Sequence, residues 1–484
     1  MKDKLLSGLF WVLLLNLIVK PFWILGIEVG VQNAVGEETY GFYFAIFNLA
    51  YIFNILLDLG VTNFNTRNIA QHPVLISKHL PALLSIKTLL LGLYLVVTFT
   101  VALLWGYNSR QFLLLAFLTF NQFLNSLILY LRSNFQGLLL FKWDSLISVL
   151  DRVLMILICG ALLWLPKHPT FKIEYFVLAQ TTAYLITALL ALMLLIRKTG
   201  FHRLRFNKPF TLAILKKSAP FALLVLLMAS YNRLDPVLLQ RFATNGDFQA
   251  GIYAGSFRLL DALTMIAYLV SVPLLPIFSK LTQKPNENLL ELDSSTRLVT
   301  SLMIVFSVTT AVAFSTFNEP LMELLYKTNG SLYCPSFRIL IYGIIPISFT
   351  YIFGTLLTAG GQLRGLNLLA SLTLVINIAI NLFAIPRWGA QGSAWASLIA
   401  QSFMAAAQVV LAMKLYRLKP SGSYLLRIVL FVVCIIVLSR LGFNSWIIHL
   451  LFMFVTSLAL ALILRLVDIA ELIQIVKQKQ EEKN

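Results

Sequence analysis

The chain of 484 residues is 59% hydrophobic and only 12% charged, which is too apolar for a soluble globular protein. Apolar stretches of about 20 residues, the length that spans a bilayer, fill most of the sequence and exclude a soluble enzyme on a single membrane anchor. They do not alternate apolar and polar residues, which excludes an outer-membrane barrel. The net charge of +18 does not indicate a nucleic-acid partner, because the connections between the stretches are short.

Apolar runs bounded by charged residues or by Gly and Pro predict an all-α integral membrane protein with about 14 transmembrane helices. No signal-peptide cleavage site follows the first run, so we expect an uncleaved first span. The expected ranges are 5–29, 40–64, 80–105, 111–131, 143–165, 173–196, 217–240, 248–279, 292–316, 334–359, 365–385, 389–413, 424–441 and 445–466.

Basic residues concentrate in alternate connections between the predicted spans. Connections and tails on the side of the N-terminus hold 24 Lys and Arg residues, and those on the opposite side hold seven. Cytoplasmic loops of membrane proteins carry the positive excess, so both termini are expected in the cytoplasm. An even number of spans agrees with this arrangement, because one helix more or fewer would invert every later loop.

The longest connection, 197–216, is rich in Lys and Arg and holds no acid. We expect it to be a cytoplasmic linker between two lobes. A shift of 210 residues superposes Gly41-Phe42-Tyr43 on Gly251-Ile252-Tyr253 and Lys87 on Arg297, which favours two related lobes. The predicted organisation is an N-terminal lobe of six spans (1–196), the linker, a C-terminal lobe of six spans (217–413), two additional spans (414–466) and a polar cytoplasmic tail (467–484).

Ionisable residues also occur inside the predicted spans, where each charge at the bilayer centre costs about 2.5 to 3.5 kcal/mol. They are therefore expected to face protein or water. Arg297 and Arg338 are close enough to span ends to snorkel, and Arg258 with Asp261 can form a structural ion pair on one helix face. The embedded cations are Lys20, Lys87, Arg152, Arg233, Arg258, Arg297 and Arg338, and the embedded acids are Asp58, Asp151, Asp235 and Asp261.

The embedded cations outnumber the embedded acids seven to four. Asp151 and Arg152 are adjacent, so their side chains are expected to diverge, and Lys20 has no acid three or four residues away. A surplus cation in a low-dielectric cavity requires water or an anionic ligand. A pyrophosphate-linked lipid meets this requirement, since Arg binds phosphate oxygens through paired hydrogen bonds and Lys binds them as a point charge.

Four stretches of the sequence are informative beyond their charges: ETYGFYFAIFNLAYIFNILLDLGV, YLRSNFQGLLLFKWDSLISVLDRVLMIL, NRLDPVLLQRFATNGDFQAGIYAGSFRLLDAL and NIAINLFAIPRWGAQGSAWASLIAQ. Together they resemble the polysaccharide flippases of the multidrug/oligosaccharidyl-lipid/polysaccharide exporter superfamily, and the resemblance extends from end to end. It implies two six-helix lobes around a central cavity plus two C-terminal helices, working by alternating access. It also implies translocation of an undecaprenyl-diphosphate-linked oligosaccharide across the bacterial inner membrane for O-antigen or exopolysaccharide biosynthesis.

By position in these stretches, the resemblance assigns Arg152, Arg233 and Arg258 to binding of the diphosphate and sugar, with Asp235 and Asp261 as their neighbours. The charge count adds further cations to this cationic lumen. They are Lys20, Lys87 and Arg297.

Energy coupling requires a group that changes charge or binds an ion. Asp58, Asp235 and Asp261 are candidates for coupling to H⁺ or Na⁺, since desolvation draws a carboxylic acid toward its neutral form. Asn377 and Asn381 are four residues apart on one helix face, where they either contact sugar hydroxyls or hold neighbouring helices together.

We expect no cofactor and no metal, because the three cysteines show no metal-ligand spacing. The expected partners are the lipid-linked oligosaccharide, membrane lipid and the polysaccharide polymerase machinery. An enzyme acting on the same lipid needs an active site on a large outer loop, and none is predicted. Two transporters of the same superfamily remain alternatives: a cation-coupled multidrug exporter, whose lumen should be acidic, and a peptidoglycan-precursor flippase, whose lumen should be cationic.

Overall fold

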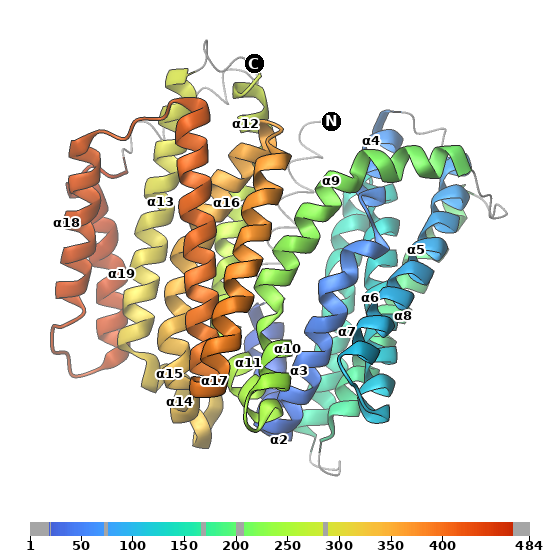
Figure 1. The fold of residues 1–484 in the computed structure, drawn as a ribbon, viewed down its shortest axis with the longest axis horizontal. Coiled ribbons are helices and arrows are strands. Elements are labelled where there is room, and N and C mark those ends of the chain that lie inside the picture. The colour runs from blue at the N-terminus through green and yellow to red at the C-terminus, as the bar shows by residue number, and fades with distance from the viewer. Residues whose placement is uncertain are drawn as a thin grey trace. The chain divides into compact units, whose positions relative to one another are not determined.

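The computed structural model describes residues 19, 21–71, 76–165, 171–199, 208–283 and 289–467, and Figure 1 shows how their helices follow one another. Within these ranges the chain is helical and contains no β-strand. Short non-α helices, η1 (Trp23–Glu28), η2 (Phe53–Leu57), η4 (Lys327–Asn329) and η5 (Ile341–Gly343), interrupt the α-helices. The α-helices are α2 (Val29–Val35), α3 (Glu37–Ile52), α4 (Val61–Gln71), α5 (Ile76–Leu104), α6 (Ser109–Gly137), α7 (Phe141–Trp164), α8 (Ile173–Thr199), α9 (Lys208–Arg233), α10 (Asp235–Phe242), α11 (Gly246–Ser271), α12 (Leu274–Leu281), α13 (Leu289–Thr316), α14 (Asn318–Tyr326), α15 (Gly330–Leu340), α16 (Ile344–Ala359), α17 (Leu363–Tyr416), α18 (Gly422–Leu438) and α19 (Trp446–Ile463).

The helices agree with the predicted number of spans. Among the described residues, ten helical segments are long and apolar enough to cross a membrane, and α9 with α10 forms a further span bent by 47°. Gly389 is non-helical and divides α17 into two helices, and α18 is a shorter apolar helix. Most of the expected first span, 5–18 and Lys20, lies outside the described residues. The predicted all-α integral membrane fold with about 14 spans is confirmed.

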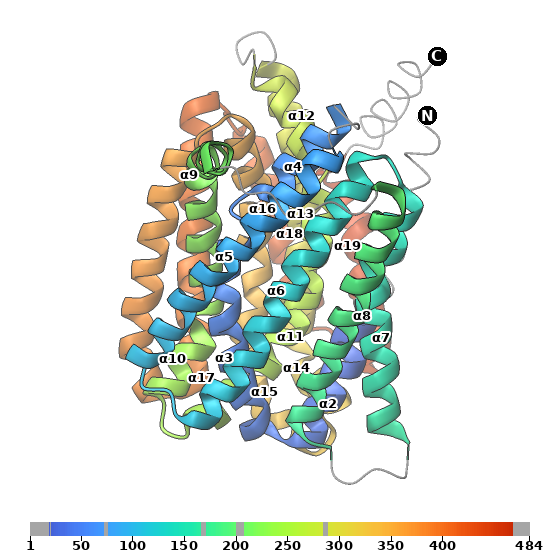
Figure 2. The ribbon, with the colours of Figure 1, turned by 90° about the vertical axis from the view of Figure 1, so that its right-hand side faces the viewer.

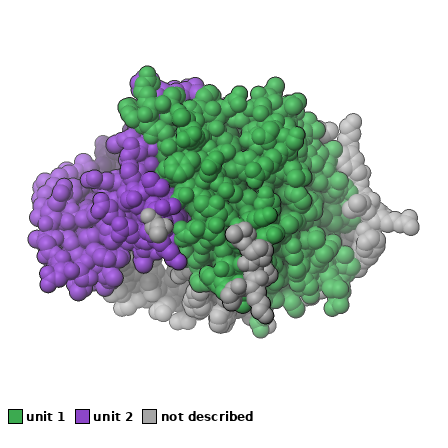
Figure 3. All heavy atoms as spheres, turned by 90° about the horizontal axis from the view of Figure 1, so that it is seen from below, with its two compact units in different colours: residues 1–255, 385–390 green, residues 256–384, 391–484 purple. Residues whose placement is uncertain are grey.

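The chain forms two compact units, which Figure 3 distinguishes by colour. Unit 1 comprises Met1–Gly255 with Ile385–Ala390, and unit 2 comprises Ser256–Ala384 with Gln391–Asn484. The lobe boundaries expected from the sequence, with a linker at 197–216, stay a prediction. In unit 1, α6 lies beside α3, α5, α7 and α8 in both ribbon views (Figures 1 and 2).

The second expected span, 40–64, is broken in its last third. α3 continues as η2 to Leu57, and the backbone turns at Asp58 before α4 begins at Val61. Leu59 and Gly60 have φ angles of 40° and 83°, a conformation that glycine adopts readily and leucine does not. The break places a carboxylate and backbone groups without intrahelical partners inside a membrane span.

A second break divides the seventh expected span, 217–240, at Leu234, between α9 and α10. Pro236 occupies the first turn of α10, where its missing N–H costs no helical hydrogen bond but where its ring prevents the preceding helix from continuing. Asp235 therefore begins a new helix inside the membrane. Asp58 has a similar place, shortly before the first residue of α4.

α3 and α11 cross with their backbones in direct contact. A Cβ atom at Gly41 would overlap the carbonyl of Asp247, and a Cβ atom at Gly251 would overlap the carbonyl of Glu37. The 210-residue shift that pairs the two glycines also pairs the two acids, so the crossing is reciprocal. Small residues allow membrane helices to approach this closely, which explains why glycine stands at both positions.

In unit 2 the last two helices pack against α13. Val308 of α13, Phe431 of α18 and Met453 of α19 belong to one buried apolar cluster, whereas the outer faces of α18 and α19 expose apolar side chains such as Val455, 67% exposed. Exposed apolar faces on helices of this length are suited to lipid.

Candidate functional site

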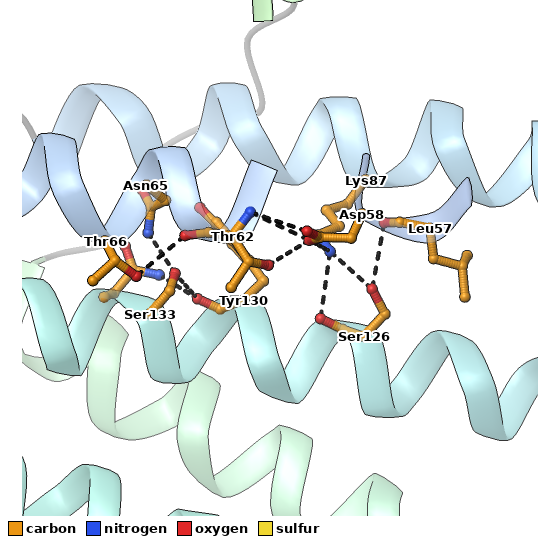
Figure 4. Close-up of polar contacts among 10 residues, drawn as sticks. Leu57, Asp58, Thr62, Asn65, Thr66, Lys87, Ser126, Tyr130 and Ser133 are labelled. Atoms are coloured by element: carbon orange, nitrogen blue, oxygen red, sulfur yellow. Dashed lines mark hydrogen bonds and ion pairs between the residues drawn. The ribbon is translucent and has the colours of Figure 1, made fainter. Parts of the chain in front are cut away.

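The break between η2 and α4 organises a polar network inside unit 1. Lys87 Nζ on α5 lies 2.6 Å from Asp58 Oδ1 and 2.8 Å from Ser126 Oγ on α6, as Figure 4 shows. The Asp58 carboxylate also accepts hydrogen bonds from the backbone N–H of Thr62, at 3.3 Å, and from the Thr62 hydroxyl. We call Asp58, Thr62, Lys87 and Ser126 the helix-break network.

Side chains of α6 around the helix-break network contact the backbone before the break and the helix after it. The Ser126 hydroxyl donates to the carbonyl of Leu57 at 3.3 Å, the last residue of η2. One helical turn along α6, the Tyr130 ring lies 5.9 Å from Lys87 Nζ. Further toward the end of α4, Asn65 donates to the Ser133 hydroxyl at 2.7 Å. These contacts fix α4 against α6, so the broken backbone has a defined geometry.

The two charges of the helix-break network differ in accessibility. The Lys87 side chain is 2% exposed, whereas the Asp58 side chain is 23% exposed. Removing one partner of a buried ion pair leaves an uncompensated charge, which typically costs about 3 to 5 kcal/mol. Lys87 therefore depends on an anionic neighbour, and Asp58 supplies it in this structure.

A second cation of unit 1, Arg152 on α7, is held by aromatic side chains. Its guanidinium lies 5.6 Å from the ring centroids of Trp23 and Tyr184, and its Nη1 donates to the Tyr184 hydroxyl at 2.9 Å. Cation–π contacts of this kind stabilise arginine away from bulk water. Arg152, Trp23 and Tyr184 form what we call the arginine–aromatic site.

The side chains of Asp151 and Arg152 lie closer together than expected for adjacent positions on a helix. The Asp151 carboxylate accepts from the backbone N–H of Arg152 at 2.8 Å, which turns it back toward its neighbour, and Oδ2 lies 3.7 Å from Arg152 Nη1. The prediction that the two side chains diverge was therefore wrong. The contact is long, and the Nε and Nη2 atoms of Arg152 make no hydrogen bond with the residues that the structure describes. Because the Arg152 side chain is 26% exposed, these donors remain available to a ligand.

The third polar group of unit 1 lies at the second helix break. The Arg233 guanidinium lies 5.4 Å from the Tyr51 ring centroid, and Asp235, which is fully buried, accepts from the Tyr253 hydroxyl at 2.7 Å. Tyr253 belongs to α11, so the carboxylate connects the start of α10 to α11.

The predicted site residues of unit 2 have different environments. Arg258 on α11 is 3% exposed, and Asp261 lies one turn further along the same helix. Arg297 is 41% exposed and pairs with Asp293 at 2.7 Å, as expected for a cation near the end of a span.

Asn377 and Asn381 are both fully buried in unit 2. Asn381 donates to the carbonyl of Asn377 at 3.0 Å and accepts from the Ser393 hydroxyl at 2.8 Å. The hydrogen bond from Ser393 joins the two halves of α17 across the kink at Gly389. Contact of this pair with sugar stays a prediction.

The structure thus brings some predicted residues together and not others. Lys87 lies against Asp58, while Arg152 has its own aromatic surroundings. Lys20 lies outside the described residues. The sequence did not reveal Ser126, Trp23 or Tyr184 as partners, since they come from distant positions and belong to common residue types of membrane helices.

Comparison with known proteins identifies the family. Residues 5–282, more than half of the chain, match the family described as polysaccharide biosynthesis protein. The chain belongs to this family. No curated protein matches it in sequence.

Solved structures share the fold at low sequence identity. The lipid II flippase MurJ, in an inward closed conformation, is 14% identical with a TM-score of 0.64, covering 95% of this chain and 98% of that one. An inward-facing multidrug resistance MATE family transporter is 14% identical with a TM-score of 0.60, covering 81% and 94%. A superfamily transporter from Pyrococcus furiosus is 14% identical with a TM-score of 0.54, covering 87% and 95%. The protein is a multi-pass helical membrane protein with the fold of these transporters.

Proposed function

We propose that the protein translocates an undecaprenyl-diphosphate-linked oligosaccharide from the cytoplasmic to the outer leaflet of the bacterial inner membrane. The observation that carries this proposal is the arginine–aromatic site. Arg152 keeps hydrogen-bond donors that no described residue uses, on a side chain that is 26% exposed and framed by Trp23 and Tyr184. A guanidinium binds phosphate oxygens through paired, charge-assisted hydrogen bonds.

The family supports the substrate class. Membership among polysaccharide biosynthesis proteins agrees with a lipid carrier of a growing glycan, and an anionic headgroup agrees with cations inside membrane helices. In this proposal Arg152 binds the diphosphate, and Lys20, Arg233 and Arg258 add positive charge to the path of the headgroup. Arg297 has a smaller role, because its exposed side chain already pairs with Asp293.

The proposed transport cycle is alternating access of two related lobes, 1–196 and 217–413, with both termini in the cytoplasm. The reciprocal crossing of Gly41 and Gly251 supports the internal repeat on which this cycle depends. Asp235 and Asp261 are proposed sites for a coupling ion, H⁺ or Na⁺, and the product would pass to the polysaccharide polymerase machinery. The protein acts as a transporter and carries out no covalent step.

A peptidoglycan-precursor flippase is the second candidate. The structural likeness to a lipid II flippase over 95% of the chain favours it, and a lipid diphosphate would use the same arginine. The arginine–aromatic site weighs against a multidrug exporter for cationic drugs, since the Arg152 guanidinium would repel a cationic ligand.

The experiment that tests the proposal deletes the gene and identifies the undecaprenyl-diphosphate-linked glycan that accumulates on the cytoplasmic leaflet. Complementation with wild type should restore surface polysaccharide, and Arg152→Ala should not. Arg110→Ala is the matched control, because Arg110 is 68% exposed and pairs with Glu174 at 3.6 Å. Raised drug sensitivity with unchanged surface glycans would instead identify an exporter, and accumulation of lipid II would identify the second candidate.

A further inference from the structure

The helix-break network contains an anion that is part of the chain itself. The carboxylate of Asp58 receives the Lys87 ammonium at 2.6 Å, the Thr62 N–H at 3.3 Å and the Thr62 hydroxyl. An ammonium, a backbone N–H and a hydroxyl are donors that bind a phosphate oxygen as well as they bind a carboxylate oxygen. The position that Asp58 occupies therefore has the chemistry of a phosphate site.

We propose that Asp58 is a displaceable occupant of this site, and that a phosphate oxygen of the transported lipid diphosphate replaces its carboxylate at Lys87. The inference rests on the proposed function for the identity of the phosphate donor. It assigns Lys87 a role as phosphate ligand and Asp58 a role as the counterion that protects Lys87 when no substrate is bound.

Lys87 is held by contacts that do not involve Asp58, and this supports exchange of the anion at Asp58. Besides the carboxylate, the Lys87 ammonium contacts the Ser126 hydroxyl at 2.8 Å and the Ser126 carbonyl at 3.5 Å. Both contacts hold the ammonium against α6 whether or not the carboxylate is present. An ammonium has three donors, so loss of Asp58 leaves one position open for another anion.

The accessibility of the two side chains also supports exchange of the anion at Asp58. Lys87 is 2% exposed and Asp58 is 23% exposed, so an incoming anion meets the side of the ion pair that Asp58 covers. A buried cation cannot be left without an anion at low cost. Exchange of one anion for another avoids that cost, whereas simple opening of the pair does not.

Displacement also connects substrate binding to the shape of the helix. Asp58 lies directly before Leu59 and Gly60, whose positive φ angles define the break. Its carboxylate holds the start of α4 through Thr62. When the carboxylate leaves Lys87, the contact that fixes the break to α5 is lost, and α4 is free to move relative to α5. In the predicted orientation this break lies in the cytoplasmic half of its span, where the substrate enters.

Pyrophosphate binding to the purified full-length protein tests the inference. Isothermal titration calorimetry in detergent, with sodium pyrophosphate at constant ionic strength, compares wild type with Asp58→Asn. Removal of the internal competitor should strengthen pyrophosphate binding by about tenfold. The double variant Asp58→Asn/Lys87→Gln should lose this gain, since it lacks the ammonium.

Asp144→Asn is the matched control. It removes one acid from another ion pair of the same unit, Arg132 with Asp144 at 2.7 Å, and should leave pyrophosphate binding unchanged. Equal gains in Asp58→Asn and Asp144→Asn would show a general charge effect and overturn the inference. So would binding by Asp58→Asn no tighter than wild type, or a gain that survives Lys87→Gln. If Asp58→Asn does not fold, Asp58→Ser is measured against the same criteria.

Transport of the lipid substrate by wild-type protein separates the two proposals. If the wild type moves an undecaprenyl-diphosphate oligosaccharide but Asp58→Asn shows no gain, the displacement inference fails and the proposed function stands. If Asp58→Asn gains pyrophosphate affinity through Lys87 but the wild type moves no such lipid, the phosphate site stands and the proposed function fails.

Discussion

Gly41 and Gly251 meet by direct backbone contact where α3 crosses α11, and the 210-residue shift maps each onto the other. The same shift maps Glu37 onto Asp247, and these are the residues whose carbonyls each glycine approaches. A chance match of two short sequence segments would not generate reciprocal contacts. The crossing therefore supports an internal repeat.

Substitution of either glycine by leucine should damage this crossing. Gly41→Leu and Gly251→Leu force a side chain into a backbone, and overpacking of this kind costs about 1 to 3 kcal/mol or more. The melting temperature of the purified protein should fall by several degrees in both variants. Gly92→Leu is the control, because a Cβ at Gly92 meets nothing within 4 Å. Equal stability of all three variants would show that the helices do not pack this closely.

The ion pair of Lys87 and Asp58 gives a stability prediction that is independent of transport. Lys87→Met leaves the Asp58 carboxylate without its ammonium and should destabilise the protein by about 3 to 5 kcal/mol. Lys87→Met/Asp58→Asn removes both charges and should recover at least half of that loss. Thermal unfolding in one detergent compares them. A buried ion pair would be contradicted if Lys87→Met had the same melting temperature as wild type. It would also be contradicted if the double variant were less stable than Lys87→Met.

The helical membrane fold was predictable because the length of each apolar stretch and the charges that bound it can be read from contiguous residues. The spans at 111–131 and 143–165 correspond to α6 and α7, with ends that differ by at most six residues. The break at Asp58 was not predicted. Apolar residues stand on both sides of Asp58, and residue type alone does not specify the positive φ angles of Leu59 and Gly60 that make the break.

The site was predictable only in part. Charge counting selected Lys87 and Arg152 as cations inside spans, but it did not pair Lys87 with Asp58, which is 29 positions away. A pairing of residues so far apart depends on helix packing, which the sequence pattern does not specify. Trp23 and Tyr184 were overlooked because aromatic residues are common in membrane helices and carry no formal charge.

The arginine–aromatic site predicts that charge alone is insufficient at position 152. Arg152→Lys keeps the positive charge but loses the planar donor pair and its stacking on Trp23. Loss of one charge-assisted hydrogen bond is worth about 1.5 to 3 kcal/mol, so transport should fall by about tenfold or more. Surface polysaccharide in a complemented deletion strain measures this, with protein levels checked by immunoblot. Full activity of Arg152→Lys would show that a point charge is enough.

Arg297 should behave differently from the buried cations. Its contact with Asp293 joins an exposed and a partly exposed side chain on one helix turn, and such pairs contribute about 0.3 to 0.5 kcal/mol. Arg297→Ala should therefore leave the melting temperature within a degree or two of wild type. A loss as large as that of Lys87→Met would indicate that Arg297 has a buried partner in the folded protein.

Reconstituted vesicles offer the most direct test of the central claim that Arg152 helps to move a lipid diphosphate across the membrane. Purified protein is inserted into liposomes containing a fluorescent undecaprenyl-diphosphate oligosaccharide, and the fraction of label reached by a membrane-impermeant quencher is followed over time. Wild type and Arg110→Ala should equilibrate the label between leaflets, and Arg152→Ala should resemble protein-free liposomes. Equal rates for wild type and Arg152→Ala, or no movement by wild type above the protein-free rate, would contradict the account.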